Sequence, residues 1–461
     1  MKTKRKLRLA SVEYYRWVRP RLFLCGCLSI FSGSAFATTE LVLQLETSLS
    51  SDTNPFRFYD TAPVAPPDAA NLPNVPNGTI GTSGTNGISK TSDTSTGVDL
   101  RVGAVIPLLS DRTRLILTGS LGNHHYKNYR ELDHHTGAGD ASLEWVTGSL
   151  LNGRVTAGKE DRLFQYINGS LTDKDISHQT RSSAEVSMNV TDDWTVQAKF
   201  DRSGLTYDLP VNQLYNFDAS GKQLGIRYRV PTGSSIEVGS RWSESHYPDR
   251  TEQQIADLDQ RYKETELYLD GEWKYSVKSV TSAHFGVIRR QYESLAERNT
   301  NLFNALWRGT YYYSPKLRLD LQFWDRPFSI VDPAILYVVT KAVRFDAQWK
   351  WTDRTQFNLS GLLQNSDQQL IPRLSTLAEG VSRKEKLQRL GVGANFQIER
   401  GFRLFFDSFY EKVSRDPDGL NLKQGVVKIG LEYTYENLPG SAARMGLNRY
   451  QQSLSATDAL R

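Results

Sequence analysis

The feature that most constrains this chain is a two-residue alternation of apolar and polar side chains. In 316–324 every second residue is Leu or Phe, with Arg, Asp and Gln between them; 343–351, 390–398 and 427–435 repeat the pattern. Successive side chains of a β-strand point to opposite faces, so the pattern predicts strands with one apolar and one polar face. Counting such segments predicts an all-β fold of about 18 strands, with 16 as the alternative.

The connections between the predicted strands alternate between short and long. The short ones contain turn-forming residues and are 108–112, 150–151, 191–193, 231–233, 276–277, 314–315, 352–353 and 399–400. This alternation predicts a transmembrane up-and-down antiparallel β-barrel, with short periplasmic turns and long extracellular loops. A soluble sandwich of strands would not require it.

The charged face of each predicted strand supports a barrel around water. Burying unpaired charges in a dry core is costly, whereas a water-filled lumen removes that cost. A barrel of about 18 strands is wide enough to leave an aqueous channel. Aromatic residues gather near the short turns, on the parity of the apolar face, and predict a girdle at the membrane interface. They are Trp194, Trp273, Tyr275, Tyr311, Tyr313, Trp349, Trp351, Phe402, Tyr433 and Tyr435.

The first 37 residues have the pattern of a secretory signal peptide. They hold eight basic residues and one acidic residue, an apolar stretch from Leu22 to Phe31, and the small-residue site 35–37. The whole chain has a net charge of +5, so the remaining 424 residues carry −2, and we expect no nucleic-acid partner. Both cysteines, Cys25 and Cys27, lie inside the peptide, which leaves a barrel without disulfides.

Three further segments complete the predicted organisation. The barrel covers 38–437, and it contains the Pro-, Gly- and Ser-rich segment 55–95. That segment is either a mobile outer loop or a constriction folded into the lumen. Residues 438–461 show no strand pattern and form a C-terminal tail, which departs from the aromatic C-terminal residue of many outer-membrane barrels.

Charged residues and one tryptophan on the polar parity are the candidate pore-lining and polymer-contact residues. They include Arg101, Arg227, Arg229, Arg241, Arg308, Arg318, Asp320, Trp324, Arg344, Asp346, Arg389 and Arg403. Two interpretations remain open for them. They can form ion pairs that hold the wall, or they can form a track for a hydrated polymer, with arginines reading carboxylates or phosphates and an aromatic ring stacking on sugars.

Metal and catalytic sites are not predicted. His124-His125 and His134-His135 are adjacent pairs, whose side chains point to opposite faces of a strand, so neither pair can chelate a metal by itself. They would have to converge across a hairpin. No nucleophile elbow, HExxH motif or P-loop occurs. We therefore expect no enzyme activity, no metal and no cofactor.

The segment after the first predicted strand resembles a known family. Asp52, Asn54, Pro55, Phe56 and Arg57 match an Asp-x-Asn-(apolar)-Phe-Arg element found early in EpsL-type outer-membrane proteins of exopolysaccharide operons, the β-barrel porin type 2 group. The resemblance in signal peptide, length and strand pattern covers the mature chain. It implies a barrel in the outer membrane of a Gram-negative bacterium that helps to export exopolysaccharide with periplasmic and inner-membrane proteins. It implies no catalytic residues.

Three functional hypotheses follow. The first is an outer-membrane channel for polysaccharide export, with outer-membrane lipid and polysaccharide as partners. The second is a general or sugar-selective diffusion porin, which would use the same barrel and lumen. The third is a structural or adhesion barrel with a plugged lumen. The sequence leaves the polymer, the direction of transport and the oligomeric state open.

Overall fold

The computed structural model describes residues 39–57, 59, 92–110, 112–164, 174–328, 335–370, 383–417 and 419–447. The predicted signal peptide with its two cysteines lies outside these residues, as do most of the segment 55–95 and the end of the tail, 448–461. By its contacts the chain divides into Met1–Thr39 and Glu40–Arg461, and every element below belongs to the second unit.

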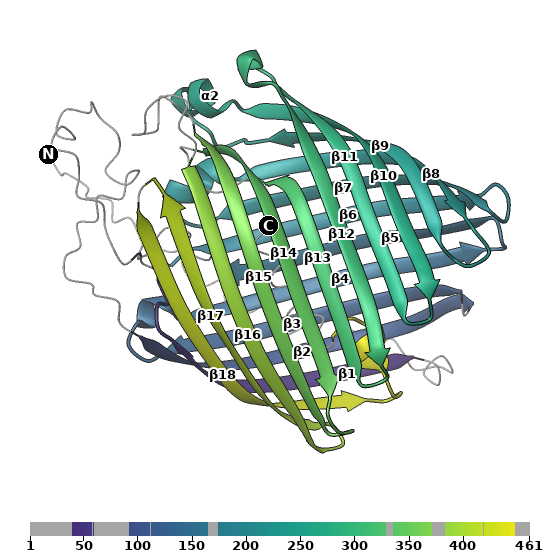
Figure 1. Ribbon diagram of the computed structural model, residues 1–461, viewed down its shortest axis with the longest axis vertical. Coiled ribbons are helices and arrows are strands. Elements are labelled where there is room, and N and C mark those ends of the chain that lie inside the picture. The colour runs from purple at the N-terminus through teal and green to yellow at the C-terminus, as the bar shows by residue number, and fades with distance from the viewer. Residues whose placement is uncertain are drawn as a thin grey trace, which may run out of the picture. The chain divides into compact units, whose positions relative to one another are not determined.

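The second unit forms a closed barrel of 18 antiparallel strands (Figure 1). Each strand pairs with its neighbours in sequence, and β1 pairs with both β2 and β18, which closes the sheet. The predicted up-and-down barrel is therefore confirmed. The strands are β1 (Glu40–Asp52), β2 (Asp93–Ser110), β3 (Thr113–Tyr126), β4 (His134–Thr147), β5 (Leu151–Leu163), β6 (Ile176–Asn189), β7 (Trp194–Tyr207), β8 (Phe217–Arg229), β9 (Ser235–His246), β10 (Arg261–Ser276), β11 (Ser279–Tyr292), β12 (Thr300–Ser314), β13 (Leu317–Phe328), β14 (Ile335–Lys350), β15 (Thr355–Leu370), β16 (Arg383–Glu399), β17 (Phe402–Asp416) and β18 (Leu420–Glu436).

Short and long connections emerge at opposite ends of the barrel. The predicted short connections all coincide with turns, and four of the long ones carry short helices. These helices are η3 (Arg130–Leu132), η4 (Pro210–Tyr215), α2 (Glu252–Leu258) and η5 (Ala296–Arg298). One connection at the long end is only 417–419, because β17 ends at Asp416 and β18 begins at Leu420. No helix in the described part of the chain is long and apolar enough to cross a membrane.

The outer surface of the barrel carries an apolar belt. One side-chain parity of each strand presents large apolar groups that remain exposed, including Leu43, Leu117, Val155, Ile226, Phe285, Leu363 and Ile429. Aromatic side chains beside the short turns are also exposed, including Trp194, Trp273, Tyr275, Tyr311, Tyr313, Trp349, Trp351, Phe402 and Tyr435. Closed barrels with an apolar belt that ends in an aromatic girdle are typical of proteins in the outer membrane of Gram-negative bacteria. The protein is an outer-membrane barrel with its short turns on the periplasmic side.

The first part of the C-terminal tail folds back inside the short-turn end of the barrel. Helix α3 (Ser441–Arg444) and the residues after it pack Met445 and Leu447 against Val42 on the inner face of β1. The carboxylate of Glu40 fixes the helix, because it accepts a 2.8 Å hydrogen bond from the Ser441 hydroxyl and pairs with Arg444 at 2.7 Å. The described tail is thus a folded part of the periplasmic mouth.

Candidate functional site

The candidate site is the inner wall of the barrel. Strand pairing puts the predicted pore-lining residues on the parity opposite the apolar belt. In the row that crosses β7 to β9, for example, Thr195 faces Arg227 and Arg227 faces Glu237, while the next residue in the chain, Tyr228, faces the outer-surface residue Trp194. Every residue in the predicted set has this inward parity. The register thus gives the wall a layered pattern of charged and polar side chains.

Two of the predicted arginines pair with an acid on their own strand. The Arg318 Nη2 atom lies 2.9 Å from Asp320 Oδ1 on β13, and the Arg344 Nε atom lies 2.7 Å from Asp346 Oδ2 on β14. Residues i and i+2 of a strand share a face, so such pairs form without help from a neighbouring strand. Asp320 also accepts a 2.6 Å hydrogen bond from the Thr310 hydroxyl.

The other paired arginines reach across strands. Arg227 pairs with Glu237 at 2.7 Å, Arg241 with Asp201 at 3.2 Å, Arg101 with Glu46 at 3.3 Å, and Arg403 with Glu432 at 2.5 Å. Arg389 pairs with Glu411, whose side chain is fully buried. Each of these carboxylates compensates a guanidinium that would otherwise be partly desolvated. The wall is therefore built largely from local, neutralised pairs.

Arg229 and Arg308 are the exceptions in the predicted set. Both are exposed, and in the described part of the chain neither forms an ion pair. Arg229 lines a hollow of about 580 Å³ on the inner face of β8 to β12, together with Ser235, Glu272 and Ser282. These two guanidiniums are the predicted residues best placed to meet a solute, since their charge is not already satisfied by the wall.

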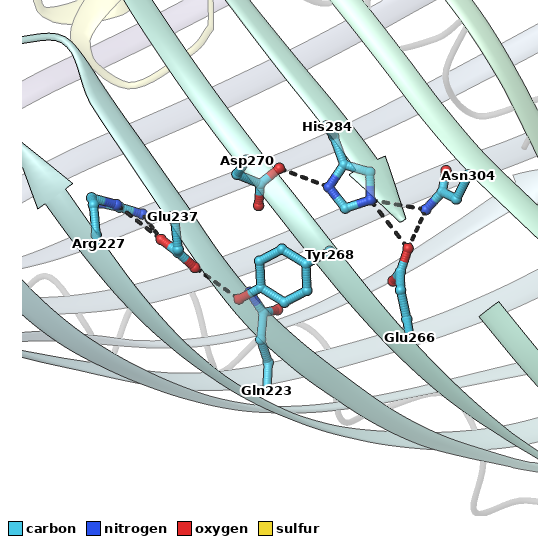
Figure 2. A network of polar contacts seen from close by, with 8 residues as sticks. All are labelled: Gln223, Arg227, Glu237, Glu266, Tyr268, Asp270, His284 and Asn304. Atoms are coloured by element: carbon cyan, nitrogen blue, oxygen red, sulfur yellow. Dashed lines mark hydrogen bonds and ion pairs between the residues drawn. The ribbon is translucent and has the colours of Figure 1, made fainter. Parts of the chain in front are cut away.

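The hollow borders a polar network that spans five strands (Figure 2). Glu237 accepts from Arg227 at 2.9 Å and from the Tyr268 hydroxyl at 2.8 Å, and that hydroxyl accepts from Gln223 at 2.8 Å. Tyr268 is 4% exposed although it lies on the inner parity. The network therefore fixes the carboxylate of Glu237 in the wall and leaves it little freedom to bind a solute.

His284 completes the network on the next strand. Its Nδ1 atom lies 2.7 Å from Asp270 Oδ1, and its Nε2 atom lies 3.1 Å from Glu266 Oε1 (Figure 2). The amide nitrogen of Asn304 also donates to Glu266, at 2.7 Å. Ionised carboxylates only accept hydrogen bonds, so the imidazole satisfies both of them only when both of its nitrogens carry protons. Such a ring is a cation within the wall rather than a metal ligand.

Two inward-facing aromatic rings of the wall, Trp324 and Phe405, are packed rather than presented to the lumen. Trp324 is 7% exposed and packs against Ala342 and Leu362, and Phe405 is 1% exposed. Stacking on a sugar requires an accessible ring face. Trp324 therefore has the inward parity expected of it but contributes to a small apolar cluster in the wall.

The residues Asp52, Asn54, Pro55, Phe56 and Arg57 form a strap that turns inward at the outer end of β1. Asp52 Oδ1 accepts a 2.7 Å hydrogen bond from the Asn54 backbone, which starts the turn. Arg57 has a φ of 56°, in the left-handed region that a non-glycine residue rarely adopts. The local hydrogen bond and this backbone conformation turn the chain away from the line of the strand.

Side chains of the strap anchor it to the inner wall. Arg57 contacts Glu411 at 2.5 Å and Gln424 at 2.9 Å. Phe56 is 2% exposed, packs with Leu132 of the next outer loop, and meets the Tyr129 ring edge-on at 4.8 Å. The beginning of the segment 55–95 therefore lies against the wall of the outer mouth, while residues 60–91 lie outside the described ones.

The histidine pairs meet across their hairpin without forming a metal site. His124 faces His134 in the β3–β4 register, and the two rings stack at 4.9 Å with an interplanar angle of 19°. His134 Nδ1 lies 2.8 Å from the Leu132 carbonyl oxygen, and His125, on the other face, contacts Asp133 at 3.1 Å. No cluster of three or more metal-ligating side chains occurs among the described residues.

Sequence reasoning missed the groups whose position depends on long-range register. Glu46 and Glu411 are nearly or fully buried partners of the predicted arginines, and Arg57 reaches the wall from a loop. Their parity alone would have marked the two glutamates as inward-facing. Nothing local in the sequence pairs Arg57 with Glu411, which lies 354 residues away.

No family model and no curated protein matches the chain. Among solved structures, the chain is similar to Acinetobacter baumannii OccAB2, at 11% identity, 88% coverage of this chain, 100% coverage of that chain and a TM-score of 0.46. It is also similar to Pseudomonas aeruginosa OccK2 (OpdF) in complex with glucuronate, at 11% identity, 87% and 99% coverage and a TM-score of 0.47. At these scores the barrel assignment rests on the chain's own strand order and register.

Proposed function

We propose that the protein is a passive channel for small hydrophilic solutes across the outer membrane. The observation that carries this proposal is the inner wall of a closed 18-strand barrel, which is rich in polar and charged side chains and neutralises most of its predicted arginines in local pairs. Barrels of this strand number are wide enough to hold an aqueous channel. Water and small solutes can pass such a wall without having to break the ion pairs that hold it.

The two unpaired arginines lead us to expect that the channel prefers anions over cations. Arg229 and Arg308 are exposed inward-facing cations without an ion pair in the described residues. A cation beside the permeation path lowers the energy of a passing anion and raises that of a cation. We therefore expect a weak anion preference that falls as ionic strength rises, because salt screens exposed charges.

Single-channel conductance of the refolded barrel in a planar bilayer tests the proposal. We expect stepwise open events, and a reversal potential in a salt gradient that moves toward cation selectivity in the variant R229Q/R308Q. Lys278, in the short turn after β10, offers a matched control, since K278Q removes a cation outside the hollow. A correctly folded barrel that never conducts would contradict the proposal and favour a plugged structural barrel.

Export of exopolysaccharide is the second candidate function. The observation in its favour is that the motif behind the family resemblance builds a defined strap at the outer mouth through Asp52, Asn54, Phe56 and Arg57. The buried rings of Trp324 and Phe405 give it no support. Deleting the gene and measuring surface polysaccharide separates the two functions, because a general diffusion channel can be lost without reducing the polymer.

A further inference from the structure

Between the apolar belt and the long connections, the outer surface of the barrel carries basic residues. Toward the long connections, the outward parity changes from apolar to charged side chains, and on half of the strands the first charged residue is Lys or Arg. Lys159, Lys222, Lys263 and Arg289 are examples, and all four are exposed. Two of the outward lysines pair with outward acids, Lys159 with Asp161 at 3.5 Å and Lys341 with Asp325 at 3.3 Å. The surface just outside the belt therefore carries basic residues on many strands, some neutralised and some not.

Three of these cations come together on β16, β17 and β18, which are neighbouring strands (Figure 1). Lys412 lies directly opposite Lys423 in the β17–β18 register. Lys386 is the diagonal neighbour of Lys412, because Lys412 faces Gln388 on β16. Like charges directly opposite each other destabilise a pair of strands, so an arrangement of this kind needs an anion or open water to compensate it.

The lysine cluster, Lys386, Lys412 and Lys423, is not neutralised by the protein residues around it. All three side chains are exposed, and within the described ranges none forms an ion pair. The nearby outward acids Asp416 and Asp367 both lie opposite Lys384 in the register. Lys384 is two residues further from the apolar belt than Lys386. The cluster therefore presents three cations toward whatever covers the outer surface at that height.

Immediately below the cluster the surface is apolar. Leu390 faces Tyr410, and Val427 lies on the next strand; these side chains are 58%, 52% and 44% exposed. Acyl chains cover such a surface in a membrane, and the headgroups of the same lipids lie one or two residues higher along the strands. Lysine suits this boundary, since its apolar stem lies along the belt while its ammonium group reaches the polar layer.

We propose that Lys386, Lys412 and Lys423 bind the phosphate of an anionic glycolipid of the outer leaflet, with its acyl chains against Leu390, Tyr410 and Val427. The apolar surface below the cations distinguishes a lipid from a free anion, because only a lipid covers both parts. Clusters of basic residues at a membrane surface attract anionic headgroups with roughly additive contributions from each cation. The site lies on the outer surface and is separate from the lumen and from any solute that passes through it.

The test is binding of diphosphoryl lipid A to the full-length barrel, refolded in a neutral detergent and followed by native mass spectrometry. The variant K386Q/K412Q/K423Q should bind on the order of 100-fold more weakly than the unaltered protein. The matched control K159Q/K222Q/K263Q removes the same number of outward lysines on strands that are not neighbours, and it should bind within about threefold of the unaltered protein.

Three results would overturn the proposal. Equal loss of binding in both triple variants would mean that net charge, and not the cluster, attracts the lipid. Equal binding of dephosphorylated lipid A would mean that the acyl chains alone hold it. Displacement of lipid A by an equal concentration of inorganic phosphate would make this a free-anion site. The heat-modifiable gel mobility of each variant verifies that its barrel is folded. If the triple variant does not fold, the single variant K412Q is used in its place, because it removes one of the two directly opposed lysines.

Discussion

Replacing Glu411 with glutamine should destabilise the barrel more than any other loss of one inner-wall carboxylate described above. The side chain of Glu411 is fully buried between Arg57 of the strap, 17% exposed, and Arg389 of β16, 19% exposed. Glutamine keeps the size of the side chain and can still accept a hydrogen bond through its carbonyl oxygen. The substitution therefore removes the charge and leaves two partly buried guanidiniums without their counter-ion.

The size of the effect follows from that burial. Removing one partner of a buried ion pair costs about 3–5 kcal/mol, and hydrogen bonds to charged groups contribute about 1.5–3 kcal/mol each. Because both arginines keep some contact with water, we expect the lower end, about 3 kcal/mol. Glu144 provides the matched control, since it also contacts two arginines, Arg114 and Arg154, but these are 50% and 56% exposed. Exposed pairs contribute about 0.2–1 kcal/mol each, so E144Q should cost about 1 kcal/mol.

Urea unfolding in lipid vesicles, followed by tryptophan fluorescence, measures both free energies. A difference of about 2 kcal/mol between E411Q and E144Q is the expected result. Equal costs would refute the argument from burial. A double-mutant cycle with R57Q then isolates the strap: a coupling energy near zero between positions 57 and 411 would mean that Arg57 does not hold the strap to the wall.

Two further substitutions test the segments that cover the ends of the barrel. A side chain at Gly103 would meet Met445 Sδ at 2.6 Å from its Cβ, so G103L should displace α3 and expose the tail to protease, whereas G139L, with open space around it, should not. Arg250 lies over the Tyr247 ring at 3.7 Å and donates to three backbone carbonyl oxygens of the outer loops. Burial lowers the pKa of its guanidinium, and a lysine would face the same burial with fewer donors. R250K should therefore loosen these loops, measured as faster proteolysis between β9 and β10 without loss of the barrel.

The strands and their faces were predictable because both depend on local alternation. Leu317, Leu319 and Leu321 define an outward face without knowledge of the neighbouring strand, and Arg318 and Asp320 then face inward. On the outer side the alternation places the ends of β17 and β18 near 414 and 424, whereas these strands extend to Asp416 and from Leu420. Outside the belt both faces of a strand meet water, the alternation disappears, and residues around 417–419 read as part of a longer loop.

The cross-strand partners of the wall residues could not be predicted, because they depend on register. Sequence parity placed Arg389 on the inner face, but its contact with Glu411 follows from the pairing of β16 with β17. The strap adds a contact between residues 57 and 411, far apart in the chain. The opposition of Lys412 and Lys423 likewise follows from the β17–β18 register, which the alternation of side chains within each strand does not determine.

Charged residues are mostly paired on the inner face of the barrel and partly unpaired on the outer face. This difference supports a channel for small solutes over a track for a charged polymer. Inside, Arg318 and Arg344 each have a carboxylate two residues away on the same strand, so their fields largely cancel within a few ångströms. A polyanion would gain from a continuous row of uncompensated cations. The two predicted inner-wall arginines without an ion pair among the described residues, Arg229 and Arg308, lie on β8 and β12, which are not neighbouring strands. Uncompensated cations are instead adjacent on the outer surface, where the lipid headgroups are. A small solute needs no such row, because it contacts only a few residues of the wall at any moment.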